Sequence, residues 1–221
     1  MKFNIKIALT ISFVAACILY LYMLATVTND IVLRNAFKPV PILILLMLYS
    51  FESKKIDPLV ISMFATMVIA DIINNTINMF HIAILIYGIA NLFLIKIIAN
   101  LLKKDAKKQI LKYFLLAIML FIIVFVFVVQ NKGKSFYPII FYGLTMSLAF
   151  AISLSNYLHN MNVANEVLLI AMGIRVISDS IYAVVIFNVS NVYFDVASLS
   201  IYMLSCYVFY RGFILKDKII N

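Results

Sequence analysis

The strongest constraint on this chain is a series of long apolar runs that recurs from Ile5 to Leu215. Hydrophobic residues make up 66% of the 221 residues and charged residues only 12%, whereas a soluble domain has about a quarter charged and about half apolar residues. The chain has only five Gly and four Pro, which leaves little room for long structureless loops. It is therefore predicted to be a single transmembrane domain over residues 1–221.

Charges, prolines and asparagine clusters divide the runs into eight segments of about the length that a bilayer requires. The predicted segments are 5–28, 37–51, 58–75, 79–102, 110–130, 137–156, 165–188 and 193–214. Helices are expected because barrel strands would be shorter and would alternate in polarity. The predicted fold class is all-α, a polytopic bundle of about eight transmembrane helices. The first segment is too long for a signal-peptide core, so we expect it to remain as the first span.

The distribution of Lys and Arg predicts the orientation of the bundle. With a cytoplasmic N-terminus, the predicted inner loops and ends carry twelve of these residues and the outer loops carry four. Both termini are therefore expected in the cytoplasm, with the bacterial inner membrane as the expected cell membrane. The net charge of +9 is interpreted as this bias and as attraction to anionic membrane lipids. No nucleic acid partner is expected, because the sequence predicts no soluble basic face.

Short matches suggest an internal repeat. Phe-Lys-Pro at 37–39 opens the second predicted span, and Phe-Tyr-Pro at 136–138 opens the sixth. Ala-Asp at 70–71 lies deep in the third span, and Ser-Asp at 178–179 lies deep in the seventh. Four spans separate the members of each pair, so the repeats would be parallel rather than inverted. The two halves would be 1–108 and 109–221, and chance matching is the alternative.

Two aspartates fall inside predicted spans, at matched depth. Asp71 and Asp179 each lie about 20 Å from the inner start of their helix, at a rise of about 1.5 Å per residue. An ionised group at the bilayer centre costs about 2.5–3.5 kcal/mol on the insertion scale, so such residues usually face a polar cavity or a partner. Two carboxylates at one level suit general acid/base catalysis, because one can hold a proton while the other stays charged.

Other polar residues lie near the two aspartates and are candidates for substrate binding: Lys38, Asn75, Arg175 and Ser178. Arg175 precedes Asp179 by four residues and shares its helix face, and Lys38 opens the second span at the same level. A purely structural alternative stays open, in which Arg175 neutralises Asp179 and Lys38 neutralises Asp71. Lys96, also inside a span, is expected to extend to the cytoplasmic head groups.

The remaining residues indicate no metal and no cofactor. Cys17 and Cys206 lie in apolar runs without metal-ligand spacing, so they are interpreted as small packing residues. No P-loop, GxGxxG, GxSxG or HExxH motif is present. The Tyr and Phe residues are expected to face lipid, with an aromatic belt near the membrane surfaces. The belt residues would be Tyr49, Tyr137, Tyr157 and Tyr193.

The segments around the aspartates resemble the YhhN/TMEM86 family. The stretch 173–187, GIRVISDSIYAVVIF, is similar to its signature GA-x-LF-x-x-SD-x-x-x-A-x-x-x-F. Lys-Pro at 38–39 resembles the KP that opens the second helix of the family. Ala-Asp at 70–71, with Gly88 downstream, resembles its GD motif and a following glycine. Lys96 stands where the family usually has a histidine, a difference that bears on substrate preference.

This resemblance implies lysoplasmalogenase activity, with a lysophospholipid as substrate. Such enzymes hydrolyse a vinyl ether to a fatty aldehyde and a glycerophospho-base, and Asp71 and Asp179 fall where the essential aspartates of the family would lie. Lys38 and Arg175 are candidate contacts for the substrate phosphate. The alternatives are a non-catalytic lipid-binding or transport protein and a structural bundle. The sequence leaves open the head group, the oligomeric state and which aspartate is the acid.

Overall fold

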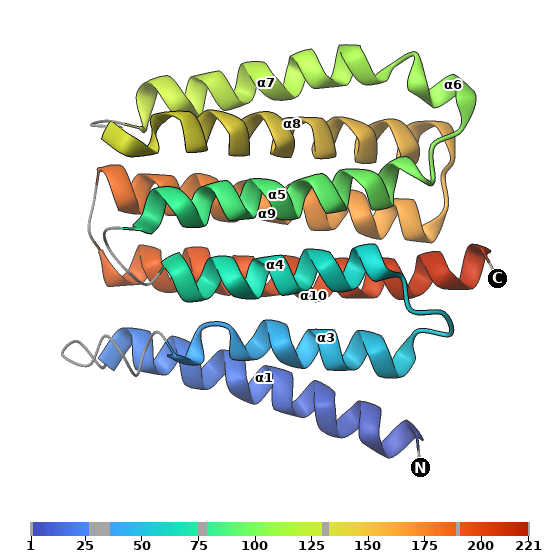
Figure 1. The fold of residues 1–221 in the computed structure, drawn as a ribbon, viewed down its shortest axis with the longest axis horizontal. Helices are drawn as coiled ribbons and strands as arrows, with labels where there is room; N and C mark the ends of the chain where they lie inside the picture. Colours follow the sequence, from blue (N-terminus) through green and yellow to red (C-terminus); the bar gives the residue numbers. More distant parts are fainter. Residues whose placement is uncertain (1, 27–35, 75–78, 130–132, 189–190, 221) are drawn as a thin grey trace.

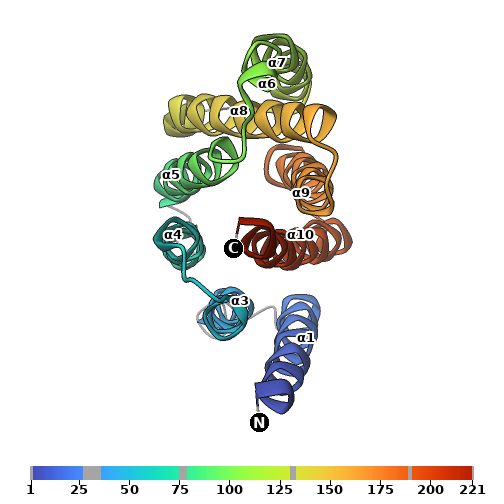
Figure 2. The ribbon, with the colours of Figure 1, turned by 90° about the vertical axis from the view of Figure 1, so that its right-hand side faces the viewer.

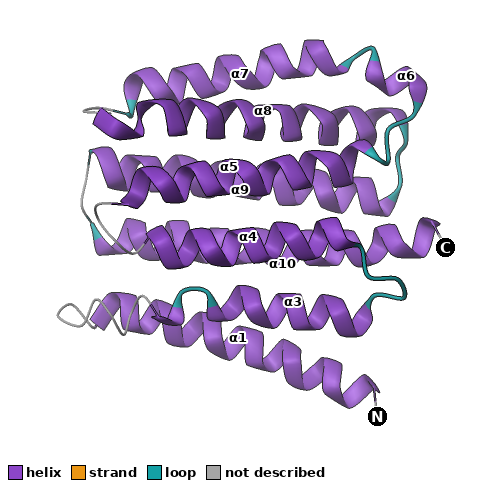
Figure 3. Cartoon of the chain, in the orientation of Figure 1, coloured by secondary structure: helices purple, strands orange, loops and turns teal. Residues whose placement is uncertain are grey.

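The fold is known from a computed structural model that describes residues 2–26, 36–74, 79–129, 133–188 and 191–220 (Figure 1). In these ranges every regular element is helical, as Figure 3 shows, so the predicted all-α class is confirmed. The helices are α1 Lys2–Thr26, α3 Val40–Glu52, α4 Pro58–Asn74, α5 Phe80–Ala99, α6 Lys104–Lys107, α7 Ile110–Phe127, η2 Gly133–Ser135, α8 Phe136–His159, α9 Val163–Phe187 and α10 Val192–Ile220.

Six of the described helices are long and apolar enough to cross a membrane. Their apolar spans are Asn4–Thr26, Phe80–Ala99, Asp105–Phe127, Gly133–His159, Val163–Phe187 and Val192–Lys218. The membrane bundle is therefore confirmed, but the predicted count of eight spans is not. Helices α3 and α4 have 13 and 17 residues, which give about 20 and 26 Å, less than the bilayer core of about 30 Å.

Local sequence explains where the two short helices begin. Pro39 is the N-cap of α3 and Pro41 lies in its first turn, where the missing N–H removes no helical hydrogen bond. Pro58 is the first residue of α4, and Asp57 accepts a hydrogen bond from the amide of Leu59 (3.0 Å). Because α3 begins after Pro39, Lys38 lies in the turn before this helix, close to the polar interior described below.

Six of the helices form a closed ring when viewed along the bundle (Figure 2). Contacts run in order from α3 to α4, α5, α8, α9 and α10, and from α10 back to α3. Helices α1 and α7 lie outside the ring, against α3 and α8 respectively. A set of polar and charged residues, among them Lys38, Asp71 and Arg175, is buried within the bundle, while many large hydrophobic side chains are exposed.

The helix contacts repeat after four main helices. The pairs α1–α3, α3–α4, α4–α5 and α5–α8 correspond to α7–α8, α8–α9, α9–α10 and α10–α3. Figure 2 shows the related helices on opposite sides of the ring, around an axis that runs along the bundle. This is the arrangement that parallel repeats would give. The duplication itself stays a prediction.

Both termini lie at the same end of the bundle (Figure 1). At this end Lys6 of α1 binds Glu52 of α3 (2.6 Å), and Tyr210 of α10 donates a hydrogen bond to the same carboxylate. Lys216 pairs with Asp57 (2.9 Å). These contacts tie α1 and α10 to the chain around the α3–α4 turn. The shared end agrees with the predicted topology, and its cytoplasmic location stays a prediction.

Gly88 of α5 allows a close approach to α8. A Cβ built at this position would lie 2.5 Å from the ring of Phe141, whereas one at Gly173 of α9 would have no heavy atom within 4 Å. We expect Gly88→Ala to lower the free energy of unfolding by about 1–3 kcal/mol through overpacking. Gly173→Ala should raise it by up to about 1 kcal/mol, because alanine favours the helix.

Thermal unfolding of the two variants in detergent provides the comparison, with Gly173→Ala as the matched control. Equal melting temperatures for both variants would contradict the close contact between α5 and α8.

Candidate functional site

Asp71 of α4 is fully buried and receives donors from three other parts of the chain. Lys38 Nζ lies 3.1 Å from its Oδ1, and Tyr202 of α10 donates to its Oδ2 (3.2 Å). Tyr87 of α5 donates a second hydrogen bond to this carboxylate. A carboxylate in lipid needs such partners, because desolvating an unpaired charge is costly. Asp71 thus joins α4, α5, α10 and the turn before α3.

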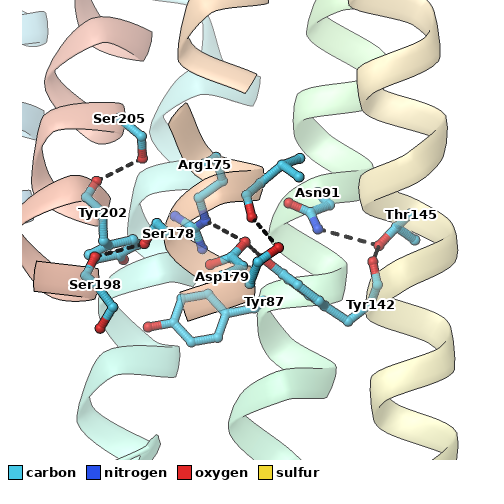
Figure 4. A network of polar contacts seen from close by, with 12 residues as sticks. Tyr87, Asn91, Tyr142, Thr145, Arg175, Ser178, Asp179, Ser198, Tyr202 and Ser205 are labelled. Carbon is cyan, nitrogen blue, oxygen red and sulfur yellow. Dashed lines mark hydrogen bonds and ion pairs between the residues drawn. The ribbon is translucent and has the colours of Figure 1, made fainter. Parts of the chain in front are cut away.

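Asp179 of α9 has a different environment. Arg175, one turn earlier, donates from Nε to Oδ2 (3.1 Å), and Tyr142 of α8 donates to the same oxygen (2.5 Å). Figure 4 shows Arg175, Asp179 and Tyr142 in line between α9 and α8. The side chain of Asp179 is 27% exposed, against 0% for Asp71. Asp179 is therefore the more accessible of the two carboxylates.

Arg175 connects the two carboxylate clusters. Its guanidinium carbon lies 4.4 Å from the ring centroid of Tyr202 and 5.6 Å from that of Tyr87. Both distances fall within the range of a cation–π interaction, and both tyrosines also donate to Asp71. The pairs Lys38–Asp71 and Arg175–Asp179 are therefore parts of one polar network within the ring.

A cavity of about 120 Å³ lies beside this network. Its polar lining comprises Lys38, Asn74, Tyr87, Tyr142, Arg175, Ser178, Asp179, Tyr182, Ser198 and Tyr202, and apolar side chains of α5, α8, α9 and α10 complete the wall. We call it the polar cavity. It has room for several water molecules and offers them hydrogen-bond partners. Asp71 is not part of its lining, because Lys38, Tyr87 and Tyr202 lie between this carboxylate and the cavity.

The structure brings most of the predicted site residues together. Lys38, Arg175, Ser178 and Asp179 line the polar cavity, and Asp71 contacts it through its donors. Ser178 donates to the backbone oxygen of Ser198 (2.8 Å), which ties α9 to α10. Both pairings of the structural alternative, Lys38 with Asp71 and Arg175 with Asp179, are present. The prediction for Asn75 lies outside the described residues.

Lys96 does not take part in this site. Its side chain is exposed on α5 and is not part of the lining of the polar cavity. A polar contact deeper in the bundle comes instead from Asn91 of α5, whose amide reaches the hydroxyl of Thr145 on α8 (3.4 Å). That hydroxyl donates to the backbone oxygen of Tyr142 (2.9 Å), as Figure 4 shows. Asn91 therefore supports the helix turn that carries Tyr142.

Three functional tyrosines were not predicted. Tyr87, Tyr142 and Tyr202 were expected to face lipid, but their hydroxyls bind the aspartates. Each lies more than one turn inside an apolar helix, and this position is itself a signal, because a phenol hydroxyl in lipid needs a partner.

The belt prediction has a mixed outcome. Tyr137 and Tyr193 are 79% and 85% exposed, as expected for belt residues, and Tyr157 is partly buried. The prediction is wrong for Tyr49, which is fully buried and accepts a hydrogen bond from the amide of Asp57 (3.1 Å).

The cysteines and acidic groups offer no metal centre in the described part of the chain. Cys17 and Cys206 are free thiols. Within the described ranges no group of three or more His, Cys, Asp or Glu side chains is placed to hold a metal ion. The chemistry available at the polar cavity is that of one carboxylate, Asp179, with a lysine, an arginine and several phenols, while Asp71 lies behind its donors.

Apolar helices around a buried polar network and cavity define a multi-pass membrane protein with an internal site. The YhhN family model matches residues 33–213, a range that contains every residue of the network. The chain therefore belongs to the YhhN family. Neither the curated proteins nor the solved structures include a match to it.

The Lys38–Asp71 pair can be tested by removing one charge. Lys38→Met keeps the length of the side chain but leaves Asp71 without its cation, and we expect a loss of about 3–5 kcal/mol in the free energy of unfolding. The double variant Lys38→Met/Asp71→Asn should recover part of this loss, because it leaves no unpaired charge.

The exposed Lys96 provides the matched control, since Lys96→Met removes a lysine from an apolar helix without breaking a buried pair. Reversible unfolding in mixed detergent micelles measures all three variants. A loss for Lys38→Met no larger than that for Lys96→Met would show that the buried pair contributes nothing to stability.

Proposed function

We propose that this chain is a membrane hydrolase that cleaves the vinyl ether bond of lysoplasmalogens to a fatty aldehyde and a glycerophospho-base. The observation that carries the proposal is Asp179, a partly exposed carboxylate held by Arg175 and Tyr142 at the wall of the polar cavity. Its location inside a bundle of apolar helices suits a substrate that arrives from the bilayer. Membership of the YhhN family supports the same class of reaction.

The reaction requires an acid and a base. A proton adds to the β-carbon of the vinyl ether and gives an oxocarbenium ion. Water then adds to the cationic carbon and loses a proton, and the resulting hemiacetal collapses to the aldehyde and the alcohol. One water is consumed, the proton is returned, and no net oxidation or reduction takes place. Positioned side chains can supply both proton transfers.

The unequal exposure of the two aspartates suggests different roles. Asp179 reaches the cavity, so we assign it the stabilisation of the oxocarbenium ion and the uptake of the proton from water, as carboxylates do in glycoside hydrolysis. Asp71 does not reach the cavity, but Lys38 and Tyr87 bind it and do line the cavity. We therefore assign Asp71 the positioning of these two donors, through which the proton is supplied to the substrate.

The charges around the cavity suit a phospholipid head group. Lys38 and Arg175 bring two positive charges, and the two aspartates balance them. A guanidinium has five N–H donors, and the ion pair with Asp179 uses the one on Nε. The ammonium of Lys38 has three donors. Both cations therefore have donor capacity for a phosphate oxygen, and charged donors bind phosphate strongly.

A second candidate function is a non-catalytic lipid-binding or transport protein of the same fold. It is favoured by the two ion pairs, because they neutralise both aspartates without any substrate. Such a protein would bind ether lysophospholipids or move solute across liposome membranes, and it would form no aldehyde.

The two candidates can be separated by an assay of aldehyde release from a lysoplasmalogen by the purified protein. We expect the wild type to form aldehyde and Asp179→Asn to lower kcat by about 10²–10⁴, the usual contribution of a positioned acid or base. Asp71→Asn should also lower kcat strongly, because it releases Lys38 and Tyr87 from their positions.

Glu52→Gln serves as the control for both variants. Glu52 is a carboxylate bound by a lysine and a tyrosine at the opposite end of the bundle, so its replacement should leave kcat nearly unchanged. Full turnover in both aspartate variants would remove them from the mechanism, and lipid binding without aldehyde in the wild type would favour the second candidate.

A further inference from the structure

A second cavity, of about 190 Å³, lies between α7, α8 and α9. We call it the apolar groove, because its lining is dominated by hydrophobic side chains such as Phe121, Val124, Met146 and Phe150. Of the residues in the two ion pairs, Asp179 lines the groove, as does its hydrogen-bond partner Tyr142, whereas Lys38, Asp71 and Arg175 do not. Its size and character suit a hydrocarbon chain.

The apolar groove adjoins the polar cavity. Five residues line both: Val129, Ile139, Tyr142, Asp179 and Ala183. Asp179 and its partner Tyr142 are the polar members of this set, so they lie at the junction of the two spaces. A molecule that occupied both spaces would place its polar part near Arg175 and Lys38, its apolar part along α8, and the bond between them at Asp179.

Helix α7 covers the groove loosely. Ala117 is the one buried residue among the described residues of α7, and Leu120, which lines the groove, is 57% exposed. Helix α1, which occupies the corresponding place in the first half, packs against both α3 and α10. Helix α7 packs chiefly against α8 and lies at the edge of the bundle (Figure 2). The groove is therefore accessible from the bilayer side.

We propose that the apolar groove binds the hydrocarbon chain of a single-chain lipid whose head group occupies the polar cavity. The proposal rests on the proposed function for the identity of the head group and of the reacting bond. In a lysoplasmalogen the vinyl ether joins the polar part to the chain, so it would lie at the junction, next to Asp179.

From Tyr142 to Phe150 the groove follows α8 for about 12 Å at a rise of about 1.5 Å per residue. A space of about 190 Å³ suits one chain, so lysolipids are the expected ligands rather than two-chain lipids.

The first test shortens the groove. Among the residues of α7 that line the groove, Ala117 lies nearest to the N-terminus of this helix. Ala117→Phe should therefore block the far end of the groove. Met119→Phe adds a similar ring on the same helix at a 62% exposed site and is the matched control. With long-chain lysoplasmalogens we expect Ala117→Phe to lower kcat/KM by about tenfold or more, because a displaced chain misplaces the reacting bond. For substrates whose chain ends before Ala117, the same variant should lower kcat/KM by less than about twofold. Met119→Phe should leave kcat/KM unchanged for both kinds of substrate.

The second test does not depend on hydrolysis. A saturated alkyl-ether lysophospholipid, which has no vinyl ether to cleave, carries a photoreactive diazirine at the end of its chain. In lipid nanodiscs we expect it to label residues of α7 and the 143–150 stretch of α8 in the wild type and in Met119→Phe, and to lose this labelling in Ala117→Phe. Labelling spread over lipid-facing helices such as α1, with no difference between the variants, would overturn the proposal.

The two proposals fail in distinguishable ways. Labelling of the groove by the saturated lipid, together with no aldehyde release from a lysoplasmalogen, would overturn the proposed function and leave the chain-binding groove standing. Aldehyde release without groove labelling, and without any effect of Ala117→Phe on long-chain substrates, would overturn the groove alone.

Discussion

The buried carboxylate of Asp71 is the constraint on which the interior of this protein depends. A charge in the bilayer is stable only where partners replace water, and Asp71 obtains three donors from the turn before α3, from α5 and from α10. These donors can meet only if the turn before α3, α5 and α10 all come together around Asp71 of α4. The same side chains then form the wall of the polar cavity. The requirement to satisfy one charge thus specifies both the packing and the site.

The helices, and the presence of charged residues inside them, could be predicted from the sequence, because hydropathy and charge are properties of single segments. All eight predicted segments correspond to described helices, with ends that differ by a few residues. A matched depth of Asp71 and Asp179 was predicted from the helical rise. However, α4 begins at Pro58 and α9 at Val163, so the two residues lie 13 and 16 positions from the starts of their helices. The count of spans did not follow, because α3 (Val40–Glu52) and α4 (Pro58–Asn74) are both shorter than the bilayer core.

The partners of the charged side chains were harder to predict, because they depend on which sides of the helices pack against each other. Tyr87, Tyr142 and Tyr202 have the same composition signal as tyrosines that face lipid, and only the ring arrangement places them on the aspartates. Lys96 is a different case. It was marked by a difference from the family pattern, yet its side chain points away from the site. The different exposure of Asp71 and Asp179 also arises from packing, because it depends on what covers each side chain.

The hydrogen bond from Tyr202 to Asp71 crosses between the two halves of the ring, since α4 belongs to the first half and α10 to the second. Separating the halves would strip a donor from a carboxylate in a medium without water, at a cost of about 1.5–3 kcal/mol for a hydrogen bond to a charged group. Helices α7, α8 and α9 all belong to the second half. The chain of a lipid that enters beside α7 therefore contacts one half only, and its head group meets the seam between the halves at the polar cavity, which both halves line.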